Sequence, residues 1–592
     1  MNRRHHLRTA LIGLAALIGL AALLPSCDYS SKKTPLPPTE ALVGPLPGAS
    51  GRGSVSRAVY EDPTSEGPAP EVDAETLKRR EIILANVIKL MRTAYNNPGG
   101  RNFELATENL NDLFKLGTTP ADYQPSKAAR EFLSRKILEQ TYQSLVTPQF
   151  TMRDARHIED CMLYKSVALR VAGEGDDLTR VRRIFDWVCR HIQLVPAESL
   201  SPAGGLRQSQ VRPADVLIRG MATENGSWSE RGWLFMALCR QVNVDVGLLT
   251  LSPRRPMALG PMADPARAQV MSWICAAIVD KKPYLFDQRI GMEIPSPDGR
   301  GVATLQDAIA VPEVLDRLEL PGQLTYGTSA ADLAGSPTRI GVLIDSTIGY
   351  LAPRMRLLQG QLRGENRTTL FRDPAEQAAN FAEALGPRLG KVDLWSLPIV
   401  VEDSLFKDAN FVSSTLSSLR FFDPRLPLVY ARTAQLRGDL AEATIKYVDL
   451  RLVKDAVMKD PKETPIPPEV QRALDLYATY FLAQCHLDQG HAGQAEDLFR
   501  MTLDLSPEPG AGRAFHYMLR WGALTNLGRI AQDKGDSAEA IRYYSLGEPT
   551  AQSHGNLLRA RDLLWANPLA EPAAPLPPAP PDTPPATAST AR

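Results

Sequence analysis

The chain has 592 residues, of which 44% are hydrophobic and 23% charged, a composition typical of soluble globular proteins with room for several domains. Lysine plus arginine and aspartate plus glutamate both number 67, which argues against a basic nucleic-acid-binding surface, and we expect no nucleic-acid partner. Beyond the N-terminal segment, the cysteines are scattered singly and form no CxxC or Cys/His cluster: Cys161, Cys189, Cys239, Cys275 and Cys485. We therefore expect no disulfide framework, no metal site and no cofactor.

The N-terminus carries the pattern of an export signal over residues 1–26. Arg3, Arg4 and Arg8 precede an apolar run at residues 11–24 that is short for a membrane-spanning helix. The run ends in Leu-Pro-Ser-Cys, which resembles the bacterial lipobox. This resemblance implies cleavage before Cys27, acylation of Cys27, and a lipoprotein anchored in a membrane of the bacterial cell envelope, facing the periplasm or the exterior. An ordinary secretory signal with a chance cysteine, or an uncleaved anchor, is the alternative.

Proline-rich segments flank the rest of the chain. Residues 27–74 indicate a disordered tether, and residues 566–592 a disordered tail. Residues 75–150 indicate a helical region, with helical apolar spacing from residue 75, over 103–116 and over 128–145.

Residues 151–330 change from helical to strand patterning. Asp176 or Asp177 can cap a helix whose apolar residues recur every three or four positions up to Ile192, and a second apolar stripe runs from Phe235 to Val242. Short strands are predicted at 244–251, 270–279 and 283–286. This order predicts two helices followed by an antiparallel sheet.

Three segments of this region resemble the core of the transglutaminase-like (papain-related) superfamily. They are GSWSERGWLFMALCR at 226–240, MSW at 271–273 and YLFD at 284–287. The resemblance implies an α+β fold with a Cys at the start of a helix, a His on the next strand and an Asp on the following one. Counting back from Arg240 places Trp228 at the cysteine position, and Met271 falls at the histidine position. Of the implied triad only Asp287 is present.

The residues at these two positions cannot carry out the catalytic chemistry that the resemblance implies. A cysteine at a helix start reacts as a thiolate when an imidazole moves its proton, and neither an indole nor a thioether can do this. The chain has no histidine between His191 and His486, so we expect no catalytic residue and no enzymatic activity here. The alternative is a hydrolase or peptidase with an unrecognised nucleophile, for which Glu230 with Asp287 could supply acid–base chemistry.

Several other residues have both a functional and a structural interpretation. Trp228, Trp233 and Trp273 could stack on sugars of a carbohydrate or peptidoglycan, but their spacing favours the core. Asp287 with Tyr284 could bind a polar ligand, although a strand-end aspartate more often forms a turn. Cys239 and Cys275 fall on apolar stripes and are expected to be inert. The histidines His486 and His491 lack a third metal ligand.

Residues 331–420 are expected to form a connecting α/β region, and residues 421–565 a set of helical repeats. Small residues and aromatics recur at fixed spacings in three places: Gly438, Ala443 and Tyr447; Gly490, Ala495 and Phe499; Gly535, Ala540 and Tyr544. These positions resemble the tetratricopeptide repeat, which implies stacked helix pairs that bind protein.

The sequence thus predicts an α+β fold: a helical N-terminal region, a transglutaminase-like domain without its catalytic Cys and His, and C-terminal tetratricopeptide-like repeats. The expected function is that of a membrane-anchored envelope lipoprotein, held by acylated Cys27, that binds protein partners through the repeats. A carbohydrate- or peptidoglycan-binding lipoprotein is a second alternative to the hydrolase.

Overall fold

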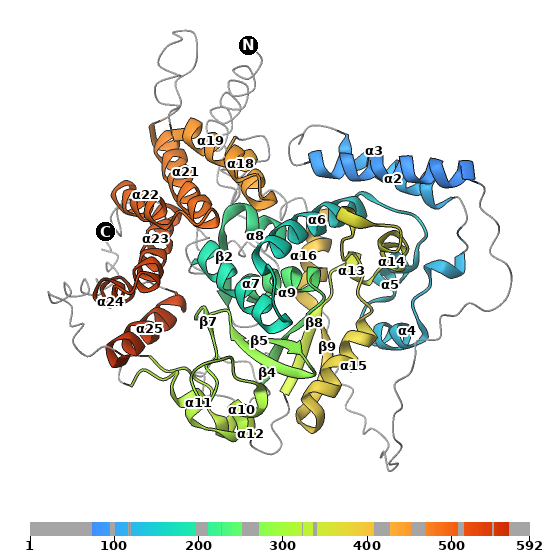
Figure 1. Ribbon diagram of the computed structural model, residues 1–592. Helices are drawn as coiled ribbons and strands as arrows, with labels where there is room; N and C mark the ends of the chain where they lie inside the picture. Colours follow the sequence, from blue (N-terminus) through green and yellow to red (C-terminus); the bar gives the residue numbers. More distant parts are fainter. Residues whose placement is uncertain are drawn as a thin grey trace, which may run out of the picture.

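The structure is a computed structural model with mixed α+β architecture (Figure 1). It describes residues 74–94, 101–115, 118, 120–195, 211–225, 228–251, 271–321, 324–334, 340–407, 427–451, 468–506, 514–546 and 550–566. Cys27, the apolar run at 11–24, the proline-rich tether up to residue 73 and the tail from residue 567 lie outside these residues. Within the described part of the chain, no helix combines the length and apolarity needed to cross a bilayer.

The N-terminal region is helical, as expected. Its elements are α2 (Ala74–Ala94), α3 (Asn102–Phe114), η1 (Pro120–Tyr123), α4 (Lys127–Ser134) and α5 (Glu139–Val146). The helical pattern over 128–145 is split between α4 and α5, because Leu138 adopts an extended backbone conformation ahead of α5. Helices α2 and α3 pack against each other and against α6 (Met152–Ala172).

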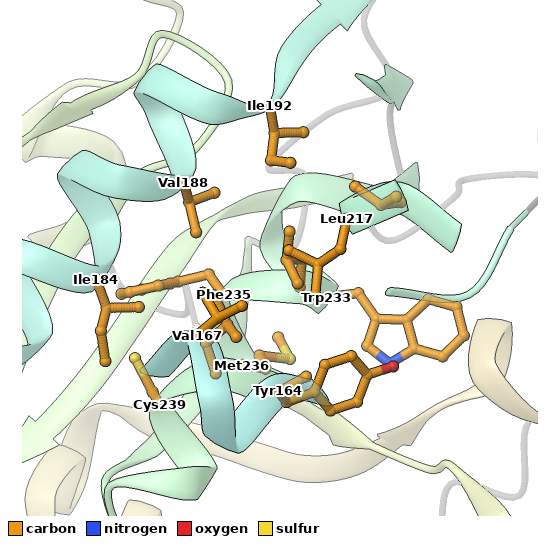
Figure 2. Packing of buried hydrophobic residues seen from close by; sticks show 14 of the residues in the cluster. Tyr164, Val167, Ile184, Val188, Ile192, Leu217, Trp233, Phe235, Met236 and Cys239 are labelled. Atoms are coloured by element: carbon orange, nitrogen blue, oxygen red, sulfur yellow. The ribbon is translucent and has the colours of Figure 1, made fainter. Parts of the chain in front are cut away.

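Four helices form the layer that carries the candidate site: α6, α7 (Asp177–His191), α8 (Pro213–Arg219) and α9 (Glu230–Gln241). Asp176 caps α7 as predicted, since its carboxylate accepts a 2.7 Å bond from the Thr179 amide. Figure 2 shows Val167 of α6, Val188 of α7 and Phe235 of α9 converging in one apolar core. Every residue of α9 is buried, so this helix is the centre of the layer.

A six-stranded sheet packs beside these helices in the order β7-β6-β5-β4-β8-β9. The strands expected from the sequence are present as β4 (Asp245–Leu251), β5 (Met271–Val279) and β6 (Lys282–Asp287), and they pair antiparallel. Short β7 (Met292–Glu293) extends that edge. A separate small sheet joins β1 (Gln193–Val195), β2 (Met221–Asn225) and β3 (Trp228–Ser229).

Residues 331–420 do more than connect two domains. Strand β8 (Ile340–Asp345) pairs antiparallel with β4, and β9 (Leu389–Trp395) pairs parallel with β8. The expected boundary at residue 330 therefore cuts through one continuous sheet. The remaining elements of this part are α10 (Leu305–Ala310), α11 (Glu313–Asp316), α12 (Ala330–Ala334), α13 (Ile348–Leu351), α14 (Pro353–Gln359), η4 (Gly364–Asn366), α15 (Pro374–Leu385), η5 (Gly386–Arg388) and α16 (Ser396–Lys407).

The C-terminal region is a row of helices along one side of the α/β body, orange to red in Figure 1. It comprises α18 (Pro427–Arg437), α19 (Leu440–Arg451), α21 (Pro468–Asp488), α22 (Ala492–Leu505), α23 (Ala514–Asp533), α24 (Ser537–Tyr544) and α25 (Gln552–Ala566). Three helix pairs turn in the same way, at Gly438, Gly490 and Gly535, whose φ angles are 92°, 78° and 79°. This left-handed conformation ends each first helix with the hydrogen bonds typical of a glycine cap.

Candidate functional site

The start of α9 is the place where the resemblance puts a nucleophile. Trp228 lies on β3 directly before the helix, opposite Asn225 of β2, and its side chain is outside the described residues. Ser229 caps the helix, because its Oγ accepts a 3.0 Å bond from the Gly232 amide. A cysteine at position 228 would therefore meet the free amides of a helix start, whereas the residue present there is an indole.

Asp287 ends β6 and is buried, with all its acceptor capacity used within the protein. Its Oδ1 accepts bonds from the Arg289 amide (2.9 Å) and Nε (3.1 Å), and its Oδ2 from Arg289 Nη2 (2.7 Å) and the Tyr326 hydroxyl (2.9 Å). These contacts make Asp287 a turn former paired with a guanidinium.

Met271 opens β5, opposite Leu251 of β4. Since Cys275 faces Phe286 across β5 and β6, Asp287 lies at the same end of the sheet as the first residues of β5. The backbone thus brings positions 271 and 287 toward one edge, while the side chain of Met271 is outside the described residues.

Glu230 belongs to a different network from Asp287. It is buried and accepts bonds from Arg219, from the Thr223 amide (2.8 Å) and from the Val211 amide (3.2 Å). Burial raises the pKa of Glu230, and Arg219 opposes that effect. The hydrogen bonds give Glu230 a structural role between α8, β2 and α9 and do not join it to Asp287.

Glu224 is a residue that the sequence reasoning missed. It accepts bonds from the Ser229 hydroxyl (3.0 Å) and the Arg231 amide (3.1 Å). Burial raises the pKa of Glu224 to about 8. A serine–carboxylate pair at a helix start could suggest a nucleophile, but Glu224 is largely protonated at neutral pH and Ser229 is buried as a cap. The pair therefore stabilises the start of α9.

The first turn of α25 docks on the turn that follows Asp287. Arg231 is fully buried and its Nη1 donates to Gln288 O (2.9 Å) and to Gln552 Oε1 (2.8 Å). Gln552 Nε2 in turn donates to Ile290 O at 3.0 Å. A helix of the C-terminal region therefore covers the turn that follows β6.

A histidine also comes to this edge from outside the domain. The His554 ring lies edge-on to Tyr326, with ring centroids 6.2 Å apart, and Tyr326 bonds to Asp287. His554 Nε2 is engaged with Leu318 O at 2.6 Å. Sequence reasoning considered histidines within the core alone, and no local signal in the α25 sequence points to this contact.

The other candidate residues are buried. Burial raises the thiol pKa of Cys239 and of Cys275 well above the usual value, so both are poor nucleophiles. Trp233 and Trp273 are each 2% exposed, which leaves no face for a sugar. His486 and His491 have ring centroids 5.8 Å apart, and the described residues contain no group of three potential metal ligands.

A small polar cavity lies between α6, α8, α9, α13 and α16. Its volume is about 30 Å³, room for little more than water. Burial lowers the pKa of His157 to about 4 and raises that of Glu402 to about 7. The size of this cavity argues against a ligand site.

Asp488, at the end of α21, fastens the C-terminal helices to the α/β body. Its Oδ1 lies 3.0 Å from Trp187 Nε1, 3.1 Å from His191 Nε2 and 3.2 Å from Arg170 Nη1, and its Oδ2 accepts from Gln435. Burial alone would raise the pKa of Asp488, but His191 and Arg170 hold it well below its usual range. Asp488 therefore connects α6 and α7 to the first two helix pairs of the C-terminal region.

A cleft of about 900 Å³ opens between α7, the segment at 291–301 and the C-terminal helices. Its walls include Arg190 of α7, Arg300, Asp533 of α23 and Arg559 of α25. This hollow is large enough for a peptide or a sizeable ligand, and both the sheet-bearing body and the helix pairs contribute to it.

The chain matches no family model, no curated protein and no solved structure. The resemblance to transglutaminase-like domains therefore rests on the segments at 226–240 and 271–287 and on the element order of helix followed by antiparallel strands.

Proposed function

We propose that this protein is a non-catalytic scaffold, anchored to a membrane of the bacterial cell envelope through acylated Cys27, that binds protein partners with its C-terminal helix pairs. In this proposal the middle region is a transglutaminase-like domain that has lost its Cys and His. The observation that carries the proposal is the docking of α25 through Gln552 onto Arg231 and Ile290, which covers the turn after Asp287. In a transglutaminase-like enzyme that turn would adjoin the substrate site.

The helix pairs support the binding role. Ala443, Ala495 and Ala540 are all fully buried, each five residues after a turn glycine, which lets neighbouring helices approach closely. Stacked helix pairs of this kind build extended surfaces suited to peptides and partner helices.

Photo-crosslinking in the producing cells tests the binding role. A photoreactive residue at Asp533, at Asp497 or at Ile445, all exposed on the helix pairs, should capture a discrete partner protein. The matched control is the same residue at Arg130 on α4, far along the chain in the N-terminal region, which should capture none. If no position on the helix pairs gives a crosslinked protein, the scaffold proposal is wrong.

Metabolic labelling with a fatty acid tests the anchor separately. The wild-type chain should incorporate label and fractionate with membranes, and Cys27→Ala should lose both. Label retained by Cys27→Ala would exclude the lipoprotein assignment.

A further inference from the structure

The cleft between α7 and the C-terminal helices is unusually rich in arginine. Among the described residues that line it, six are arginines and four are aspartates or glutamates. The whole chain carries equal numbers of basic and acidic residues, so this excess of positive charge is local to the cleft.

The carboxylates do not neutralise all the arginines. Asp186 is shared between Arg190, whose Nε lies 2.7 Å from Oδ2, and Arg529, whose Nη1 lies 2.7 Å from Oδ1. Asp533 accepts from the same Arg190 at 3.1 Å. Arg559 makes its hydrogen bond to the Gly291 carbonyl, at 3.2 Å, and none to a described carboxylate.

One guanidinium N–H of the cleft wall is buried without an acceptor. Arg559 lines the cleft, and its Nε has no hydrogen-bond partner among the described residues. Leaving such a donor unsatisfied is unfavourable, and a carboxylate matches the guanidinium fork.

We propose that this cleft binds an acidic segment of the partner protein, with carboxylates meeting Arg559, Arg300 and Arg190. This inference rests on the proposed scaffold function and names the chemistry of its ligand. A peptide fits better than a single small anion, because the arginines come from α7, the 291–301 segment and α25, spread around a cleft of about 900 Å³. One small anion would contact a fraction of them.

Fluorescence anisotropy with labelled hexaglutamate and the full-length protein tests the inference. We expect saturable binding that weakens as salt rises, and no binding of hexaglutamine. The double variant Arg300→Glu/Arg559→Glu should weaken the affinity at least about ten-fold, since two charge-assisted contacts become repulsive. The control Arg130→Glu makes the same charge change on exposed α4 and should leave the affinity unchanged.

The remaining outcomes are also decisive. Arg300 is exposed, and its side chain has no hydrogen bond within the described ranges; its backbone amide donates to Asp298 Oδ1 and is kept in the variant. Arg300→Glu alone should therefore fold normally and still weaken hexaglutamate binding if the double variant is unstable. Wild-type affinity in both variants would overturn the inference, as would inorganic phosphate binding as tightly as hexaglutamate, which would indicate a small-anion site. Crosslinks to a partner that persist in the double variant would preserve the scaffold and remove the acidic segment from the cleft.

Discussion

Gly555, in the first turns of α25, offers a direct test of the docked helix. A methyl group built at Gly555 would overlap the Ile290 carbonyl oxygen, and its carbon would lie 2.9 Å from the Ile290 carbonyl carbon and 3.3 Å from its Cβ. Both obstacles near the carbonyl are backbone atoms, so they cannot move aside as a flexible side chain would. In Gly555→Ala, α25 must shift away from the turn after Asp287.

The magnitude follows from three opposing contributions. Replacing glycine by alanine in a helix favours folding by about 1 kcal/mol. Overpacking opposes it by about 1–3 kcal/mol. Displacing Gln552 from buried Arg231 and from Ile290 O removes a hydrogen bond to a charged group, which opposes folding by about 1.5–3 kcal/mol more. We therefore expect docking of α25 to lose about 1.5–5 kcal/mol.

Hydrogen exchange measured by mass spectrometry on the full chain would resolve this change locally. Amides of α25 should exchange about ten-fold faster or more in Gly555→Ala, because undocking precedes exchange. The control is Gly493→Ala in α22, where the added methyl meets open space and should leave exchange unchanged or slightly slower. If α25 is as well protected from exchange in Gly555→Ala as in the wild type, the packing against Ile290 is not as described and the proposed function loses its main support.

Three further results are expected. Ala540→Leu should overpack the fully buried contact with Ala531 and Tyr544 and destabilise α24 by about 1–3 kcal/mol, measured by urea unfolding, whereas exposed Ala538→Leu on the same helix should change little. Burial raises the pKa of Glu159 from 4.5 to about 8, so the folded state holds a proton that the unfolded state releases. The free energy of unfolding should therefore fall as pH rises from about 5 to 8. In Glu159→Gln, unfolding measured over the same pH range should show a weaker dependence on pH. Thiol probes should leave Cys239 and Cys275 of the native protein unlabelled, and stoichiometric labelling that unfolding abolishes would contradict their inert role.

Local patterns predicted the elements that local physics determines. The strands predicted at 244–251 and 270–279 are present as β4 and β5. Asp176 caps α7 because an aspartate side chain can satisfy the first free amides of a helix. The glycines at 438, 490 and 535, noted in the sequence for their repeat spacing, each end a helix in a left-handed backbone conformation, which favours the residue without a Cβ.

Contacts between residues far apart in the chain could not be predicted from the sequence. Nothing in residues 340–345 indicates that they pair with β4, because a buried strand has the same apolar pattern whichever neighbour it meets. The contact of Arg231 with Gln552 joins residues 321 positions apart, and neither residue type predicts it. The hydrogen-bond partners of Asp287 likewise could not be predicted from the sequence, although a turn-forming aspartate was one of its two interpretations.

The covered turn after Asp287 and the cleft both depend on the docking of α25. Because α25 sits on the turn after Asp287, its next turn carries Arg559 to the Gly291 carbonyl and so into the cleft wall. Asp488, at the end of α21, fixes the helix row to Trp187 and His191 of α7, which also lines the cleft. The binding surface proposed here is made jointly by α7, the 291–301 segment and the C-terminal helices. Loosening α25 should therefore weaken binding in the cleft even though Gly555 itself does not line it. If Gly555→Ala loses affinity for hexaglutamate while the fold of the sheet stays intact, the docking of α25 and the binding of an acidic segment are linked.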